Sequence, residues 1–216
     1  MKNSNSMKIS EGLQEDGIVV GNNYDKYASS NPIVKWMMKG FHDSLDELLA
    51  KSNPNSIHEV GCGEGYWTLQ CCQKDIDVRG SDFSETVIEI AKQNASKSGF
   101  SPELFEVKSI YDLCANEHAA DLIVCCEVLE HIDDPEEGLK KLQEITTKNI
   151  ILSVPREPIW CMLNLMRGKY ISSFGNTPGH IQHWSKSSFV KLVSKYFNVV
   201  DVRSPFPWTM LYCEKR

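Results

Sequence analysis

The pattern of apolar and polar positions changes near residue 56. From there to about residue 154, short apolar runs alternate with stretches in which apolar residues recur every three or four positions. The runs predict strands and the stretches predict helices, an alternation that is typical of a parallel sheet with helices on both faces. The predicted strands are Ser56–Gly61, Asp77–Asp82, Leu104–Lys108, Asp121–Cys126 and Asn149–Val154, and the predicted helices between them are Tyr66–Lys74, Ser84–Ser98 and Pro135–Thr147.

The segments before and after this region have different patterns. Pro32–Ala50 has apolar residues on one helical face, which predicts an amphipathic helix. After the fifth predicted strand, residues 156–179 combine Pro, Gly, Trp and Met without a clean period, so we expect an insertion that begins with a short helix near Pro158–Arg167. The predicted elements that complete the sheet are the helix Ser187–Phe197 and the alternating strands Asn198–Ser204 and Trp208–Glu214.

These elements predict one doubly wound α/β domain at residues 22–216. Its mostly parallel sheet would have seven strands, and a lid at about residues 156–184 would follow the fifth strand. The first 21 residues are polar and lack the apolar core of a secretory signal, so we expect a disordered tail there.

Composition narrows the classes of function. The chain has 216 residues, 41% of them hydrophobic, which suits one domain with a full core. The net charge of −6 argues against nucleic acid as a partner, because tracking a phosphate backbone needs clustered Lys and Arg. No apolar run reaches the roughly eighteen residues of a membrane span, although a peripheral membrane contact stays open. The eight cysteines form no C-x-x-C pair, which argues against zinc and disulfides and favours the reducing cytoplasm.

A glycine-rich turn is the strongest candidate for a ligand site. Gly61-Cys62-Gly63-Glu64-Gly65 lies between a predicted strand and a predicted helix, where glycine lets a ligand approach bare backbone. Asp82 ends the next predicted strand, 21 residues after Gly61, and a carboxylate there can accept hydrogen bonds from both hydroxyls of a ribose. The spacing therefore predicts a nucleoside cofactor.

Two residues of the turn argue against a dinucleotide. The dinucleotide fingerprint is G-x-G-x-x-G, and Tyr66 stands where its third glycine would be. The charge of Glu64 would also repel a pyrophosphate. An S-adenosyl sulfonium carries a positive centre and no phosphate, so acidic neighbours such as Glu59 are compatible with it.

Three stretches resemble the motifs of class I S-adenosylmethionine-dependent methyltransferases. Glu59–Gly65 resembles their first motif, Gly80–Ser84 their second, and Cys126–Ile132 the stretch after their fourth strand, as in ubiquinone-biosynthesis O-methyltransferases and their small-molecule relatives. The resemblance covers Tyr24–Pro155 and implies a Rossmann-like fold with S-adenosyl-L-methionine as cofactor. The cofactor-binding residues that it implies are Tyr24, Glu59, Gly61, Cys62, Gly63, Asp82, Phe83, Ser109, Ile110 and Glu127.

The residues that would bind the methyl acceptor are predicted from the chemistry of the side chains in and around the predicted lid. Two imidazoles and an indole lie close together just before a predicted helix, which suits a substrate wall. We predict His183 as the group that orients or deprotonates the acceptor, with His131 as the second candidate base. The predicted substrate residues are Arg156, Trp160, Tyr170, His180 and Trp184.

Several of these residues have a structural alternative. Asp82 could simply begin the following helix, and Tyr24 could pack on the sheet edge. Arg156 could pair with Glu157, and His131 could be a loop histidine that bonds to backbone.

A metal site is a further alternative. Glu127, Glu130, His131 and His183 form a set that suits Mn or Fe, and bacterial RNA 3′-end methyltransferases have a similar Glu-x-x-Glu-His. The same letters recur in metal-free small-molecule relatives, so we predict no metal.

These observations predict a methyltransferase that acts on a small molecule, at an oxygen. One alternative is a metal-assisted RNA 2′-O-methyltransferase, which a stoichiometric metal would favour. The other is a non-catalytic protein that binds the cofactor and regulates a partner, which tight cofactor binding without turnover would favour.

Overall fold

The computed structural model describes residues 7–15, 18–22, 24–74 and 76–216. Within them, seven strands form a sheet in the order β5-β4-β3-β6-β7-β9-β8. The first five of these strands along the chain are parallel, and β9 runs antiparallel to both of its neighbours. The strands are β3 (Ser56–Val60), β4 (Asp77–Asp82), β5 (Phe105–Val107), β6 (Ala120–Cys126), β7 (Thr146–Pro155), β8 (Phe197–Arg203) and β9 (Trp208–Lys215). The predicted Rossmann-like, mostly parallel seven-stranded fold is confirmed.

The helices begin at residues whose side chains accept hydrogen bonds from the first turn. Asn31, Ser84 and Asp134 cap α1, α3 and α5, as Ser, Asp and Asn commonly do. The α-helices are α1 (Pro32–Ser52), α2 (Tyr66–Cys72), α3 (Glu85–Ser98), α4 (Ala115–His118), α5 (Pro135–Ile145), α6 (Ile159–Met166) and α7 (Lys186–Val193). The 3-10 helices are η1 (Pro102–Leu104), η2 (Ile110–Asp112), η3 (Leu129–His131) and η4 (Ile171–Ser173).

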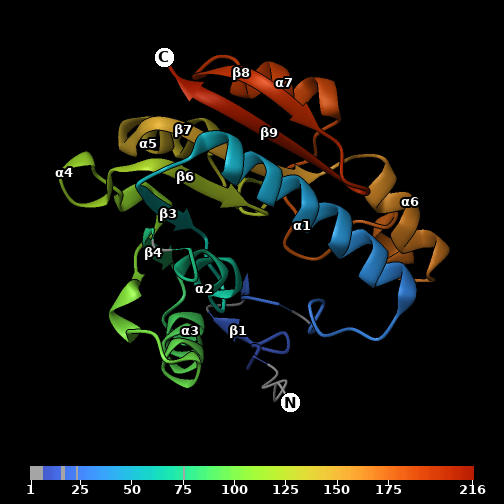
Figure 1. Ribbon diagram of the computed structural model, residues 1–216. Helices are drawn as coiled ribbons and strands as arrows, with labels where there is room; N and C mark the ends of the chain where they lie inside the picture. The colour runs from blue at the N-terminus through green and yellow to red at the C-terminus, as the bar shows by residue number, and fades with distance from the viewer. Residues whose placement is uncertain (1–6, 16–17, 23, 75) are drawn as a thin grey trace.

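The sheet is buried on both faces, which explains the long apolar runs in β6 and in the second half of β7. Ile150 and Leu152 of β7 face a cluster that contains the apolar sides of α5 and α7. Ile151, between them, faces the cluster formed with α1 and α2. Figure 1 shows α1 crossing one side of the sheet, with α7 beyond β8 and β9. No helix in the described part of the chain combines the length and apolar character needed to cross a bilayer.

The N-terminal segment differs from the expected disordered tail. Residues 7–15 and 18–21 are packed on the domain and include the short antiparallel strands β1 (Gln14–Glu15) and β2 (Ile18–Val19). Ser10 is buried, and both its N–H (3.1 Å) and its hydroxyl (2.9 Å) donate to Oε1 of Glu64. A carboxylate buried in the glycine turn needs donors, and this segment supplies them. Residues 1–6, 16 and 17 of that prediction lie outside the described residues.

Candidate active site

The glycine turn is tied to the end of the neighbouring strand. The N–H groups of Gly61 and Cys62 donate to the carbonyl oxygen of Ser81 at 2.8 and 3.0 Å. Gly61 has a φ of 75°, and a Cβ there would lie 2.2 Å from Cγ2 of Val128. Only glycine fits this position, because any side chain would collide with the loop that follows β6.

Gly63 lies in the same turn but faces open space. Its φ is 53°, and a Cβ on it would meet no atom of a described residue within 4 Å. Its N–H donates to Oδ2 of Asp82 at 3.0 Å, while Oδ1 accepts from the N–H of Ser84 at 3.1 Å. Burial raises the pKa of Asp82, and the backbone N–H donors oppose that rise. The structure therefore places a carboxylate and a bare stretch of backbone side by side at the carboxyl edge of the sheet, as a ribose site requires.

Glu127 is held at the same edge by two donors. It follows β6 directly with a φ of 62°, an uncommon conformation for a residue other than glycine. Its Oε1 accepts from the hydroxyl of Ser153 at 3.1 Å, and its Oε2 accepts from Nε1 of Trp208 at 2.6 Å. Burial raises the pKa of Glu127 to about 7. The side chain is thus fixed in one orientation and can accept a hydrogen bond from an ammonium group.

Trp208 and Ser153 are site residues that the sequence analysis missed. Trp208 begins β9 and pairs with Pro155 at the end of β7. Ser153 lies on β7, which brings it beside the end of β6. One sequence signal could have indicated Trp208: it begins a predicted strand, Trp208–Glu214, and β7, the strand that pairs with it, ends at the predicted site.

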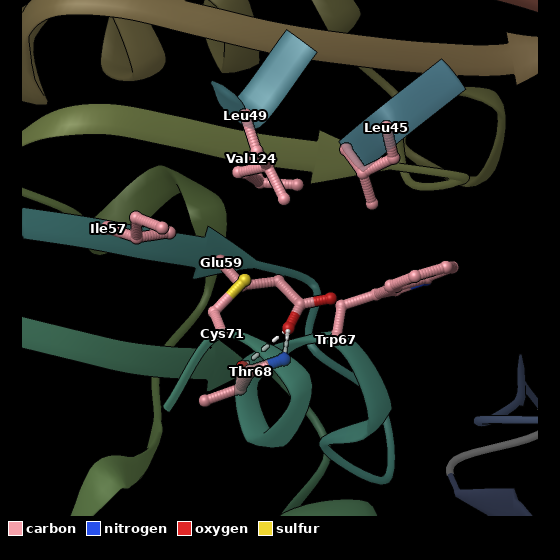
Figure 2. Close-up of a pocket in the computed structure, with 8 residues that line it drawn as sticks. All are labelled: Leu45, Leu49, Ile57, Glu59, Trp67, Thr68, Cys71 and Val124. Atoms are coloured by element: carbon pink, nitrogen blue, oxygen red, sulfur yellow. Dashed lines mark hydrogen bonds between the residues drawn. The ribbon is translucent and has the colours of Figure 1, made fainter. Parts of the chain in front are cut away.

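Glu59 is hydrogen-bonded to the first turn of α2, the helix that follows the glycine turn. Its Oε2 accepts from the N–H of Thr68 at 2.7 Å and from the Thr68 hydroxyl, so it satisfies the first turn of α2 (Figure 2). The side chain also lines a small cavity with Leu45 and Leu49 of α1 and with Val124. The structure therefore makes Glu59 a support for the turn, and its predicted contact with the cofactor stays a prediction.

The burial of Glu59 predicts a pH dependence of stability. Burial raises its pKa from 4.5 to about 8. Between these values the folded chain holds a proton that the unfolded chain has released, so stability falls as the pH rises. Glu59→Gln cannot titrate and keeps an acceptor for Thr68. Its stability relative to the wild type should therefore increase between about pH 5 and about pH 9, by on the order of a few kcal/mol.

Urea unfolding of both proteins at the two pH values measures this difference, and other titrating groups cancel in the comparison. Parallel pH profiles would show that Glu59 is ionised in the folded protein.

The other predicted cofactor residues lie at the ends of β3, β4 and β5 or in the loop before α1. Cys62 and Ile110 are buried, whereas Tyr24 and Phe83 are about half exposed. Ser109 caps η2, because its hydroxyl accepts from the N–H of Tyr111. Phe83 and Ile110 thus follow adjacent strands, an arrangement compatible with an adenine between them.

Three chemically active side chains meet after β6. The carbonyl of Glu130 accepts from the N–H groups of Ile181 and Gln182, which brings His180 beside His131 with ring centroids 4.9 Å apart. Ligand atoms of Glu130, His131 and His180 all lie within 4.8 Å of one another. Of the four residues in the metal set considered from the sequence, the structure groups Glu130 and His131 and adds His180 to them, whereas Glu127 and His183 lie outside this group.

The protonation of this group follows from its burial. Glu130 is 2% exposed, and neither carboxylate oxygen has a hydrogen-bond partner among the described residues. Burial, together with the nearby Glu127, raises the pKa of Glu130 well above its ordinary value. Burial lowers the pKa of His180 to about 3 and also lowers that of His131. Nδ1 of His131 lies 2.9 Å from the carbonyl of Gly179, which is the backbone bond considered as its structural alternative.

The predicted substrate residues occupy different environments. The indole of Trp160 stacks on His180 with centroids 5.9 Å apart and lies 6.0 Å from Trp208. Nε of Arg156 is buried without a hydrogen-bond partner among the described residues. Trp184 packs against Phe189, next to the core under α7. The structure thus brings Trp160 and His180 together near the residue that holds Glu127, and it gives Trp184 a packing role.

Of the remaining two predicted residues, Tyr170 lies in the middle of the lid and His183 lies at its end. Tyr170 precedes η4, and its carbonyl accepts from the N–H groups of Ser173 and Gly175. His183 is partly exposed, and its Nδ1 lies 3.5 Å from Oε1 of Glu157. It is therefore separate from the group around His131.

Comparisons with known proteins agree with this geometry. A family model described as "Methyltransferase domain" matches residues 33–202. The ubiquinone biosynthesis O-methyltransferase of Coxiella burnetii (strain Dugway 5J108-111) is 32% identical over 84 residues, which is 39% of this chain and 36% of that protein. The protein of the same name from Bordetella avium (strain 197N) is 32% identical over 93 residues, covering 42% and 38%. These matches span little more than a third of the relatives' length.

Solved structures share the fold at low identity. Magnesium protoporphyrin IX methyltransferase from Synechocystis PCC 6803, with bound SAH, superposes with a TM-score of 0.67 at 19% identity, covering 88% of this chain and 90% of that one. The PH0226 protein from Pyrococcus horikoshii OT3 gives 0.68 at 12% identity, covering 87% and 93%.

Proposed function

Since the chain belongs to the family of methyltransferase domains, we propose that it transfers a methyl group from S-adenosylmethionine to an oxygen of a small molecule. The observation that carries this proposal is the meeting of Gly63, Asp82 and Glu127 at the ends of three adjacent strands. Ligands of open α/β sheets bind at this edge. The eight cysteines are free, and we retain the reducing cytoplasm as the proposed compartment.

Each site residue would contact a different part of the cofactor. Asp82 would accept from the ribose hydroxyls, Phe83 and Ile110 would border the adenine, and Glu127 would accept from the methionine ammonium group. Gly63 leaves room for the methionine portion, because no atom of the described residues lies within 4 Å of where its Cβ would be. Tyr24, half exposed in the loop before α1, would close over the ligand. When bound, the cofactor supplies a methyl group on a sulfonium, ready for in-line displacement.

The acceptor would lie under the lid. Alignment with the methyl group supplies most of the rate, and a base is needed only to take the proton of a hydroxyl acceptor. Of the two predicted bases, we favour His131. Its Nδ1–H donates to Gly179, which leaves Nε2 free to accept a proton. Trp160, His180 and Arg156 would form the wall that recognises the acceptor.

We propose an oxygen acceptor because the curated relatives are named as O-methyltransferases in ubiquinone biosynthesis. A small-molecule acceptor also suits the net charge of −6, which disfavours a phosphate backbone.

Calorimetry tests the cofactor. We expect S-adenosylmethionine and its demethylated product to bind and NAD not to bind, because Tyr66 replaces the third glycine of the dinucleotide fingerprint and Glu64 is buried in the turn. Tighter binding of NAD than of S-adenosylmethionine would refute the proposal.

Release of the demethylated product with hydroxylated acceptors then tests turnover. Tight cofactor binding with no turnover on any acceptor would favour the regulatory alternative.

The unpartnered carboxylate of Glu130 favours a second candidate, a metal-assisted RNA 2′-O-methyltransferase. Glu130, His131 and His180 could hold Mn²⁺ or Fe²⁺, for which carboxylate and imidazole are suitable ligands. Under the first proposal, Glu130 instead stays protonated and the group binds no metal.

Addition of Mn²⁺ separates the two candidates. We expect the turnover of EDTA-dialysed protein to be the same with and without Mn²⁺. If turnover strictly required Mn²⁺, and if His180→Ala lost both metal binding and turnover, the RNA enzyme would be favoured. Methylation of the 2′-hydroxyl of an RNA end would then establish it.

A further inference from the structure

Three side chains with metal-binding chemistry meet at the base of the lid, apart from the group around His131. Glu157 precedes α6, Cys161 lies in its first turn, and His183 lies in the segment that leads into α7. Their ligand atoms all lie within 4.8 Å of one another. We propose that Glu157, Cys161 and His183 form a binding site for a thiophilic divalent ion, with Zn²⁺ as the first candidate.

Two of the three distances between the ligand atoms match those between ligands of one tetrahedral ion. Sγ of Cys161 lies 3.3 Å from Oε1 of Glu157, and Nδ1 of His183 lies 3.5 Å from the same oxygen. Zinc binds sulfur at about 2.3 Å and nitrogen or oxygen at about 2.0–2.2 Å, which places neighbouring tetrahedral ligands about 3.3–3.6 Å apart. The third pair, Sγ of Cys161 and Nδ1 of His183, lies within 4.8 Å, so all three atoms can converge on an ion bound at Oε1 of Glu157.

The backbone holds these ligands in place. Arg156 and Trp184 form a parallel bridge, and the N–H of Glu157 donates to the carbonyl of Trp184 at 2.9 Å. These contacts hold the first residues of the lid segment beside its last residues. Glu157 and His183 therefore lie close together although 26 positions separate them in the sequence. The N–H of Cys161 donates to Oε2 of Glu157 at 3.2 Å, which turns Oε1 toward the thiol and the imidazole. Such outer hydrogen bonds orient ligands in metal sites.

The ligand set selects the class of ion. A thiolate with an imidazole suits Zn²⁺ and Co²⁺, whereas Mg²⁺ and Ca²⁺ require oxygen ligands. The side chain of Glu157 is 12% exposed and that of His183 is 40% exposed, so solvent can reach the site and supply the fourth ligand. Binding releases the thiol proton of Cys161 to solvent. The ion would join the start of α6 to the segment before α7 and fix the base of the lid.

Cobalt titration of the full chain tests the site, because Co²⁺ bound to a thiolate has a charge-transfer absorption that oxygen and nitrogen ligands do not give. We expect chelator-stripped wild-type protein to show this band together with the visible bands of tetrahedral Co²⁺, and Zn²⁺ to abolish both by displacing Co²⁺. Cys161→Ser should lose the charge-transfer band, and Glu157→Gln should weaken binding at least tenfold.

The matched control is Cys114→Ser. Cys114 also lies near an imidazole, with its Sγ 3.5 Å from Nδ1 of His118, and Glu117 completes a similar set. We expect Cys114→Ser and His180→Ala to keep the band. Loss of the band in Cys114→Ser with retention in Cys161→Ser would overturn the proposal, as would the absence of any thiolate band in the wild type. Circular dichroism verifies that each variant is folded, and these readouts do not depend on methyl transfer.

Discussion

Asp82→Ala is expected to weaken S-adenosylmethionine binding by about 1.5–3 kcal/mol, the usual range for a hydrogen bond to a charged group. This corresponds to a dissociation constant about 10- to 150-fold higher. The reason is the position of the carboxylate, which lies at the end of β4, bonded to the backbone of Gly63 and Ser84. Calorimetry with the cofactor measures the change.

Asp77→Ala is the matched control, because Asp77 begins the same strand and is exposed at the opposite edge of the sheet. It should leave cofactor affinity at the wild-type value. An unchanged dissociation constant in folded Asp82→Ala would show that Asp82 is not the ribose ligand and only begins α3.

Gly63→Ala should abolish most of the cofactor affinity without unfolding the protein. Within the part of the chain that the structure describes, the new methyl group meets no atom within 4 Å, so it enters the space that the methionine portion would occupy. We expect affinity to fall at least tenfold, about 1.4 kcal/mol. The left-handed backbone should cost about 1 kcal/mol of stability in addition.

Gly99→Ala isolates the backbone cost. Gly99 ends α3 with a φ of 81°, and a Cβ on it also meets no atom within 4 Å. It should lose a similar amount of stability and keep its affinity. Equal affinity in the two variants would mean that the space beside Gly63 is not part of the cofactor site. Thermal unfolding and calorimetry on the same samples give both quantities.

The sequence predicted the parts of the fold that local patterns specify. Asp77–Asp82 was predicted with the bounds that the structure has, and its buried positions, Val78, Gly80 and Ser81, are apolar or small residues between two aspartates. The positions of the glycine turn and of Asp82 follow from the strand bounds, since the turn comes directly after β3 and Asp82 ends β4. Their contact with a cofactor stays a prediction. The end of α5 was less exact: β7 begins at Thr146, inside the predicted helix, where the β-branched pair Thr146-Thr147 favours a strand.

Contacts between distant segments could not be predicted from local patterns. Trp208 lies 81 residues from Glu127, and Ser10 lies 54 residues from Glu64. Each pair meets only because the sheet order or the N-terminal packing brings the segments together. The group of Glu157, Cys161 and His183 has the same origin, since its ligands do not follow a spacing such as C-x-x-C.

The bond between Trp208 and Glu127 has a consequence for the order in which the protein matures during synthesis. Residues 61–130 carry the glycine turn, Asp82 and Glu127, and they leave the ribosome well before β9 does. Yet β9 lies between β7 and β8 and carries the indole that holds Glu127. A nascent chain that lacks β9 therefore has its glycine turn but an unanchored acid beside it. Affinity for the methionine portion of the cofactor would mature last, after β9 has been inserted between β7 and β8.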